Sequence, residues 1–201
     1  SGIPSSFDGK TFVLTTGVDT GKAFVGTAKN DLFVATAGTL TVADSIDGGK
    51  GTDGLTIVET ALIRNATFEN STMKSIEIVD ITSSALDTDG ATAGNDSIIL
   101  NTTTAGKVAD NFKAVTDINL KATNATAASA TIDATVSGTQ NVTATANGTI
   151  KITGGKNIVA KTVGAITISD DNSVAGTAAT IEKITIDGLA VASTIGATKS
   201  A

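Results

Sequence analysis

The stretch NVTATANGTIKITGGKNIVAKTVGAITIS, residues 141–169, contains the pattern that decides the fold. Polar and apolar residues alternate along it with a period close to two, which is typical of strands with one buried face. Val142, Ile150, Ile158 and Ile166 each begin a strand or lie at its centre, and successive positions are eight residues apart (150 − 142 = 8). Eight residues make about one strand plus one tight turn. The stretch therefore predicts a β-meander or one face of a solenoid with short coils.

Of these two arrangements, the composition favours the solenoid. Alanine, glycine and threonine crowd the strands, and aromatic residues make up only 3% of the chain. A thin interior of stacked small side chains is easier to build from them than a sandwich core about 10 Å thick. We therefore predict an all-β fold of the β-solenoid or parallel β-helix type with short coils. The alternative is an antiparallel β-sandwich.

The same alternation recurs along the whole chain, and clusters such as Gly-Thr, Asn-Gly and Gly-Gly separate the alternating segments. Short helices are expected at residues 65–74 and 106–115. A polar linker near residue 90 divides an N-terminal β region (1–90) from a Thr/Ala/Gly-rich solenoid region (91–201), unless the two form one continuous domain. The expected strands are 11–16, 31–35, 39–43, 55–59, 75–81, 97–101, 118–122, 130–136, 142–146, 149–153, 158–162, 165–169 and 181–187.

A second, weaker repeat links distant parts of the sequence. Residues 75–81 (SIEIVDI) resemble residues 180–186 (TIEKITI), and residues 115–120 (VTDINL) form a looser third copy. Each is an apolar-acidic-x-apolar-x-apolar strand. The alternative is that these three segments resemble each other only because all are strands.

The composition also limits the function. The chain has no cysteine, histidine, tryptophan or tyrosine, and its net charge is −6. Thiol and triad catalysis, and the basic patch with stacking aromatics of a nucleic-acid binder, are therefore not expected. Binding to an anionic membrane is disfavoured for the same reason. No apolar run approaches the roughly 20 residues of a membrane span. We expect a protein that is not an enzyme.

One turn carries a metal-binding pattern. Residues 47–55, DGGKGTDGL, fit the glycine-rich nonapeptide G-G-x-G-x-D-x-U-x, in which carbonyls and an aspartate bind calcium on a parallel β-roll. Gly48, Gly49 and Gly51 would turn carbonyl oxygens toward one point, because glycine adopts positive φ freely. Asp47 and Asp53 would supply the hard anionic oxygens that Ca²⁺ prefers.

Two other turns resemble this one. Asn30-Asp31 and Asn95-Asp96 each place a carboxylate shortly before an apolar residue, with turn residues ahead of it. Tandem nonapeptides would repeat about every nine residues, but these aspartates are 22 and 43 residues apart (53 − 31 and 96 − 53). We therefore expect one to three separate Ca²⁺ sites, completed by loops that carry residues such as Asp19, Asp44 or Asp47. The alternative is that Asp53 and Asp96 cap turns through Asx hydrogen bonds without metal.

With these motifs, residues 12–58 resemble the RTX-type surface-layer (S-layer) proteins of Gram-negative bacteria. The resemblance is carried by TTGVDT (15–20), by GTAxND (26–31) with Phe33, and by SIDGGxGTDxL (45–55). It implies a calcium-binding polypeptide exported by a type I system, which assembles with copies of itself into a lattice on the cell surface. A cell-surface polysaccharide is a further partner that this interpretation allows. The alternatives are an adhesin or passenger solenoid that binds a surface ligand and, with less support, a polysaccharide-degrading enzyme.

Overall fold

One long parallel sheet runs through almost the whole molecule. The computed structural model describes residues 6–85, 97–124, 130–170, 179–188 and 193–196. In the long sheet, eight strands are hydrogen-bonded in sequence order, although other strands lie between them in the chain. They are β1 (Thr11–Val13), β2 (Leu32–Ala35), β4 (Gly54–Glu59), β6 (Ile78–Ser83), β8 (Asp117–Ala122), β10 (Asn141–Ala146), β12 (Asn157–Lys161) and β14 (Lys183–Asp187).

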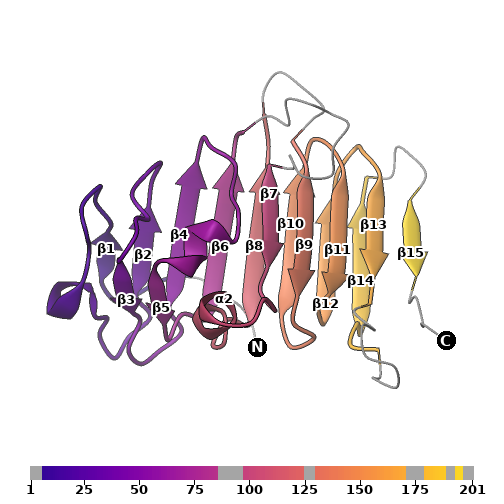
Figure 1. Cartoon of the computed structure of the whole chain (residues 1–201). Coiled ribbons are helices and arrows are strands. Elements are labelled where there is room, and N and C mark those ends of the chain that lie inside the picture. Colours follow the sequence, from indigo (N-terminus) through magenta and orange to yellow (C-terminus); the bar gives the residue numbers. More distant parts are fainter. Residues whose placement is uncertain (1–5, 86–96, 125–129, 171–178, 189–192, 197–201) are drawn as a thin grey trace.

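The strands that alternate with these form the opposing side of the coil (Figure 1). A two-stranded sheet comes first, followed by a five-stranded sheet. The two-stranded sheet consists of β3 (Ser45–Asp47) and β5 (Thr72–Lys74); the five-stranded sheet consists of β7 (Ile98–Asn101), β9 (Ile132–Val136), β11 (Ile150–Gly154), β13 (Ile166–Ser169) and β15 (Thr194–Gly196). Every strand pairing in the described residues is parallel. The prediction of an all-β parallel solenoid is therefore confirmed, and the antiparallel sandwich is wrong.

The eight-residue rhythm corresponds to half a coil. Val142 pairs with Ile158 in the long sheet, and Ile150 pairs with Ile166 in the five-stranded sheet. Each pair is sixteen residues apart (158 − 142 and 166 − 150), so one coil contains two strands and two turns. A meander would instead have paired residues eight apart.

The second repeat occupies equivalent positions in different coils. Val79, Ile118 and Ile184 lie in one row across the long sheet, through the successive pairings of β6, β8, β10, β12 and β14. The three similar segments therefore occupy equivalent places in the fold, and the same positions of each pattern face the interior.

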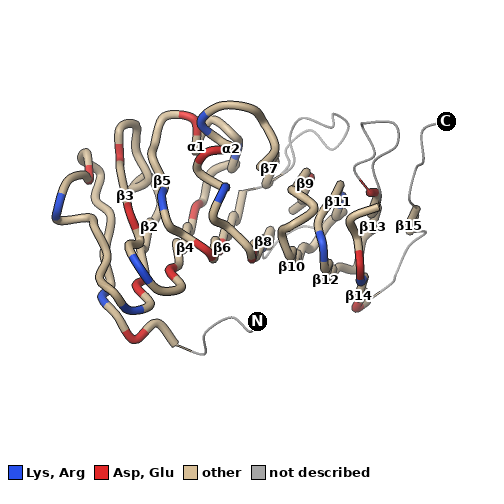
Figure 2. The backbone as a smooth tube through the Cα atoms, turned by 90° about the horizontal axis from the view of Figure 1, so that it is seen from below, with Lys and Arg blue, Asp and Glu red and all other residues tan. Residues whose placement is uncertain are grey.

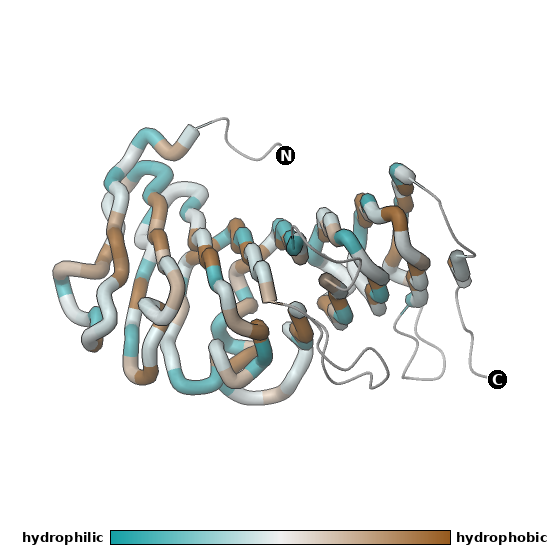
Figure 3. The backbone as a smooth tube through the Cα atoms, turned by 90° about the horizontal axis from the view of Figure 1, so that it is seen from above, coloured by the Kyte–Doolittle hydropathy of each residue, from teal (hydrophilic) through white to brown (hydrophobic). Residues whose placement is uncertain are grey.

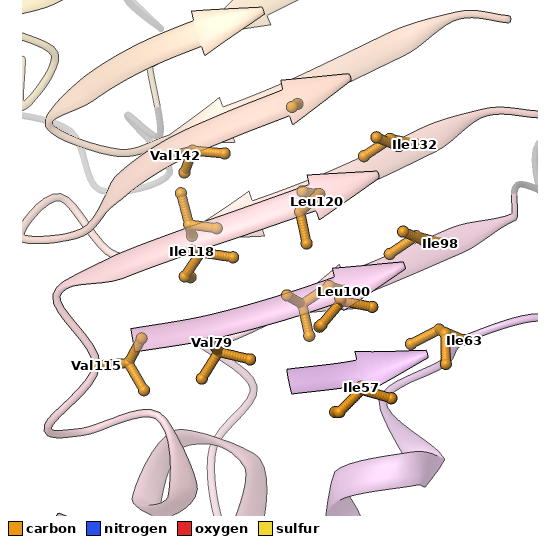
Figure 4. Close-up of a cluster of buried hydrophobic side chains, with 14 of the residues drawn as sticks. Ile57, Ile63, Val79, Ile98, Leu100, Val115, Ile118, Leu120, Ile132 and Val142 are labelled. Carbon is orange, nitrogen blue, oxygen red and sulfur yellow. The ribbon is translucent and has the colours of Figure 1, made fainter. Parts of the chain in front are cut away.

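The interior is a narrow column of aliphatic side chains between the two sides of the coil (Figure 4). Hydrophobic stretches recur from coil to coil along the molecule (Figure 3). In the C-terminal half the column is filled by isoleucine, valine and alanine; in the N-terminal half phenylalanines enlarge it. Phe12 stacks on Phe33 with ring centroids 4.6 Å apart, and Phe68 meets Phe112 edge-on at 5.0 Å.

Three short helical segments interrupt the coils. They are η1 (Gly21–Phe24), α1 (Ala66–Glu69) and α2 (Lys107–Asn111). The helix predicted at 106–115 is confirmed, although it is shorter. The prediction at 65–74 is correct only at its start, since β5 follows α1. Near the end of the two-stranded sheet, the buried Asn111 side chain accepts the Met73 N–H (2.9 Å) and donates to the Phe68 and Ser71 carbonyls.

The strand predicted at residues 39–43 is wrong. This segment is a turn, Ala43 has a φ of 73°, and the strand β3 starts only at Ser45. The physical reason is Asp44, whose carboxylate accepts hydrogen bonds from the Thr41 N–H (2.6 Å) and hydroxyl (3.0 Å). Such local bonds compete with strand pairing.

The N-terminal segment folds back over the outer face of the long sheet. A Cβ atom at Gly54 would lie 2.5 Å from the Phe7 ring, so only glycine leaves room for this ring. Gly54 thus occupies the unspecified position that follows the aspartate in the glycine-rich nonapeptide pattern. Among the described residues, no helix is long and apolar enough to cross a membrane.

Candidate metal site at the acidic corners

Stacking of the coils brings distant acidic residues together at the turn that leads into the long sheet. We call this turn the lead-in corner. Its row consists of Lys10, Asp31, Asp53 and Glu77, each directly before a strand of the long sheet, and the strand register aligns the four residues. Acidic residues recur over successive turns of this half of the molecule (Figure 2). Asp31 and Asp53, 22 residues apart in sequence, are therefore neighbours.

Each carboxylate in this row binds the backbone of the preceding coil. Asp31 Oδ1 accepts the Lys10 N–H (2.5 Å), Asp53 Oδ1 accepts the Asp31 N–H (2.6 Å), and Glu77 Oε2 accepts the Asp53 N–H (2.7 Å). The row is thus a ladder of charge-assisted hydrogen bonds. Sequence reasoning missed Glu77 as a member. Glu77 lay inside the strand expected at residues 75–81, whereas β6 begins only at Ile78, so nothing in the sequence indicated that Glu77 lies at a corner.

Asp31 is fully committed to hydrogen bonds. Its Oδ2 accepts both the N–H (2.5 Å) and the hydroxyl (2.9 Å) of Thr27, four residues earlier. Burial alone would raise the pKa of Asp31, but the N–H donors of Lys10 and Thr27 outweigh burial and hold it below its ordinary value. Asp31 is therefore an ionised turn cap that leaves little room for a metal ion.

We call the turn that leaves the long sheet the lead-out corner. Here too, aspartate side chains accept hydrogen bonds from a threonine a few residues earlier. Asp19 Oδ2 accepts the Thr15 N–H and Asp44 Oδ2 accepts the Thr41 N–H, each at 2.6 Å. Asp44 Oδ1 also accepts the Asp19 N–H from the preceding coil (2.8 Å). Asp19 and Asp44, expected to complete a metal site, cap turns at the lead-out corner instead. A threonine three or four residues before a buried aspartate is the sequence signal that was overlooked.

Asp53 is different because its turn lacks this threonine. Gly49 stands four residues before it, and the Gly49 N–H donates to Asp47 Oδ1 (3.0 Å). Asp53 is only 1% exposed, and its Oδ2 is consequently buried without a hydrogen-bond partner. Burial, followed by the negative charges of Glu77, Asp31 and Asp47, raises the pKa of Asp53 to about 6.

The glycines of this turn are required by close packing of the coils. A Cβ at Gly48 would lie 2.6 Å from Asp53 Oδ2 and 2.0 Å from the Ser75 carbonyl oxygen. Gly49 and Gly51 have φ of 89° and 123°, and a Cβ at either position would lie 2.7 Å or less from a carbonyl oxygen of the preceding turn. The glycines therefore let one turn stack directly on the next, whether or not a metal is bound.

Other predicted ligands have other partners. Asp47 forms an ion pair with Lys74 (3.0 Å). Burial would raise its pKa, but Lys74 and the Gly49 N–H hold the pKa below its ordinary value. Asn30 Oδ1 accepts the Thr52 N–H (2.9 Å). Asn95 and Asp96 lie outside the described residues.

The Asp53 site fits a hard divalent cation in charge, but only partly in ligand number. Ca²⁺ takes six to eight oxygen ligands. In the described residues, no group of three or more acidic side chains could hold a metal ion. Asp53 Oδ2 offers one unengaged anionic oxygen, with Glu77 adjacent in the row. Backbone carbonyls and water would have to provide the other ligands.

Comparisons with protein-family models, with curated proteins and with solved structures gave no match. The resemblance to RTX-type S-layer proteins therefore rests on the sequence motifs alone and stays a prediction.

Proposed function

We propose that this chain is a structural module of an extracellular, calcium-dependent bacterial surface layer, exported by a type I system, in which copies of the protein assemble with one another. The observation that carries the proposal is the buried, unpartnered Asp53 Oδ2 in the glycine-rich turn of a parallel solenoid. An uncompensated buried carboxylate is costly, so it favours either a proton or a cation.

The role of calcium follows from the charges in the lead-in corner. Bound Ca²⁺ would supply positive charge next to Asp53, where the charged neighbours Glu77, Asp31 and Asp47 are all negative. Asp53 would hold the ion through Oδ2, while its Oδ1 keeps the bond to the Asp31 N–H and so ties the ion to the ladder between coils. At free Ca²⁺ about 100 times the Kd, one such site adds about 2.7 kcal/mol to stability. Low cytosolic Ca²⁺ would leave the module less stable before export.

The elongated form suits a role in assembly. A coil that repeats along one axis presents regular surfaces on both sides (Figure 1). Hydrolysis of a polysaccharide would require two carboxylates at one place. A hollow of about 380 Å³ on the outer face of the long sheet has one acidic residue, Asp80, in its lining. The geometry therefore supports a structural or binding role better than a hydrolytic one.

The test is thermal unfolding of the protein in a chelator and in millimolar CaCl₂. We expect calcium to raise the Tm of the wild type by several degrees, since about 2.7 kcal/mol corresponds to a shift of that order. Asp53→Asn should abolish the shift. The matched control is Asp44→Asn, which removes a buried carboxylate of the lead-out corner and should keep the shift. Identical melting curves with and without calcium would contradict the proposed metal site.

Assembly is tested separately by light scattering and negative-stain electron microscopy of the wild type, with and without calcium. Ordered sheets or filaments that form only with calcium are the expected result. If the protein stays monodisperse in calcium while its Tm rises, the result supports the metal site but contradicts the surface-layer role.

A further inference from the structure

The two ends of the solenoid differ in how their apolar interior is covered. At the N-terminal end, Phe12 of β1 and the following Leu14 are buried, with 5% and 2% of their surface exposed. The Phe24 ring lies 6.5 Å from the Phe12 ring, measured between centroids, and the Lys10 ammonium lies 4.7 Å from the centre of the Phe12 ring. The first coil is therefore capped, as the end of a soluble repeat protein has to be.

The C-terminal end differs, because no strand lies beyond β14 or β15 among the described residues (Figure 1). Ile184 and Ile186 of β14 continue the interior rows of β12, yet both are only half-buried, whereas Ile158 of β12 is 1% exposed. Ile195 of β15 is 52% exposed, although Ile168 beside it is buried. A mostly apolar cleft of about 180 Å³ is lined by residues of β13, β14 and β15. Side chains that are interior in other coils are thus exposed at this end.

The backbone of β14 also has a free edge. The Lys183 N–H donates toward β12, to the Lys156 carbonyl (3.4 Å). Successive residues of a strand direct their N–H and C=O groups to opposite edges, so those of Ile184 and Ile186 point away from β12. In the described part of the chain, no strand pairs with this edge. An open edge of this kind pairs readily with another strand.

The side chains of β14 are complementary to a second copy of the same strand. Lys183, Thr185 and Asp187 are exposed on the outer face, and Ile184 and Ile186 face the interior. Antiparallel pairing of two β14 strands, centred on Thr185, places Lys183 of each copy opposite Asp187 of the other, and opposite charges across a strand pair attract. The same register places Ile184 opposite Ile186, whose backbone groups are free, so each such pair exchanges two hydrogen bonds. A single register thus satisfies the backbone, the apolar rows and the charges.

We propose that two copies of this chain join at their C-terminal coils, with the two β14 strands paired antiparallel about a two-fold axis at Thr185. With this axis perpendicular to the long sheet, the interior faces of both copies lie on the same side, and the sheet continues from one copy into the other. The contact is isologous and closes on itself. A head-to-tail contact with β1 is disfavoured, because the first coil is already capped and β1 carries no charged residue to meet Lys183 or Asp187.

This contact identifies one surface through which copies join, and in that sense it rests on the assembly role proposed above. It requires neither Asp53 nor calcium and should therefore form in chelator. A dimer in chelator supports the contact even if calcium produces no ordered assembly. Conversely, ordered assembly that is unaffected by the charge reversals below overturns the contact and leaves the surface-layer role intact.

The experiment is sedimentation velocity of the whole chain in chelator over a range of concentrations. We expect the wild type to form dimers and no larger species. Lys183→Glu and Asp187→Lys each place like charges opposite one another at both ends of the strand pair, so each variant should raise the dimer Kd about tenfold or more. An equimolar mixture of the two variants should dimerise nearly as tightly as the wild type, because opposite charges then meet at both positions.

The matched control is Lys22→Glu, which makes the same change of charge on exposed η1 at the capped end and should dimerise as the wild type does. Circular dichroism checks that each variant is folded. Three results overturn the proposal. The first is a wild type that stays monomeric at every concentration. The second is a loss of affinity in Lys22→Glu equal to that in Lys183→Glu, or oligomers that keep growing with concentration, since both indicate head-to-tail contact. The third is a mixture of folded variants that stays monomeric, which excludes this register.

Discussion

Asp53 and Asp31 show how one neighbouring residue decides the chemistry of a buried aspartate. Both lie in the same row and both accept a backbone N–H from the preceding coil. Thr27 completes the hydrogen bonding of Asp31, whereas glycine at the equivalent position leaves Asp53 Oδ2 unpartnered. The pKa of Asp31 is consequently lowered, and that of Asp53 is raised to about 6.

This difference predicts a pH dependence of stability in chelator. The folded pKa of Asp53, about 6, lies above the ordinary value of 3.8 that it has in the unfolded chain, so the folded state binds this proton more tightly. Its contribution is complete below pH 3.8 and is lost as the pH rises through 6. We expect urea denaturation to show a loss of about 2 kcal/mol between pH 4.5 and pH 7.5.

Asp53→Asn should remove this loss and be at least as stable as the wild type at pH 7.5 without calcium. Asp31 acts in the opposite direction: because its folded pKa is lowered, it gives stability that is present above pH 3.8 and disappears as the pH falls below 3.8 and through the lower folded pKa. Both proteins should therefore weaken at strongly acidic pH. A wild type that is equally stable at pH 4.5 and 7.5 contradicts the assignment of Asp53.

A second prediction concerns the threonines. Thr27→Val removes the hydroxyl that bonds to buried Asp31 and should cost about 1–2 kcal/mol in free energy of unfolding. Thr143→Val removes an exposed strand hydroxyl with no partner in the described residues and should change stability by less than about 0.5 kcal/mol. Equal effects in urea titrations would mean that the corner hydrogen bond contributes little.

Between elements, α2 is joined to β5 of the two-stranded sheet by the buried side chain of Asn111, and at the surface Lys107 donates to the Thr72 hydroxyl (2.7 Å). Asn111 gives Met73 the acceptor that a neighbouring strand would have given, and it donates to two carbonyls. An uncovered strand edge pairs readily with other chains, so this cap protects the edge as well as holding α2 in place.

We therefore expect Asn111→Ala to be among the most damaging single changes. It leaves one N–H and two carbonyls without their bonds in a buried place, which should cost about 3 kcal/mol or more. Asp110→Ala, an exposed change on the same helix, is the control. Chemical denaturation measures both, and a cost for Asn111→Ala below about 1 kcal/mol would show that water replaces the amide.

At the scale of the whole molecule, each coil contacts mainly the coils before and after it. Stability is then approximately a sum of coil and interface contributions, as in other repeat proteins. Register, rather than any single contact, keeps the column of apolar side chains continuous.

Deletion of residues 141–156, one full sixteen-residue coil, should therefore leave a folded protein. Gln140 would then join Asn157, and β12 would take the place of β10 beside β8. We expect a β-type circular dichroism spectrum and a cooperative melt at a lower Tm. Deletion of residues 149–156, half a coil, should instead place β12 on the wrong side and unfold the C-terminal part. Equal behaviour of the two deletions would contradict the coil register.

The sequence by itself determined the class of fold. The alternation of residues 141–169, its eight-residue rhythm and the scarcity of aromatics indicated an all-β fold and favoured a solenoid, because a thin column of small side chains suits short stacked strands; the parallel pairing sixteen residues apart then excluded the meander and the sandwich. The sequence also identified the turn around Asp53, since its glycines are required by backbone geometry that depends on local sequence.

Only the tertiary structure decided which of the acidic side chains is free to bind a metal ion. The ladder Asp31–Asp53–Glu77 exists because successive coils align residues 22 and 24 positions apart, and the lead-in turns differ in length, so no fixed spacing reveals it. The burial of Asp53 Oδ2 depends likewise on which coil lies beside which. Such contacts arise from stacking and therefore could not be predicted from any one segment.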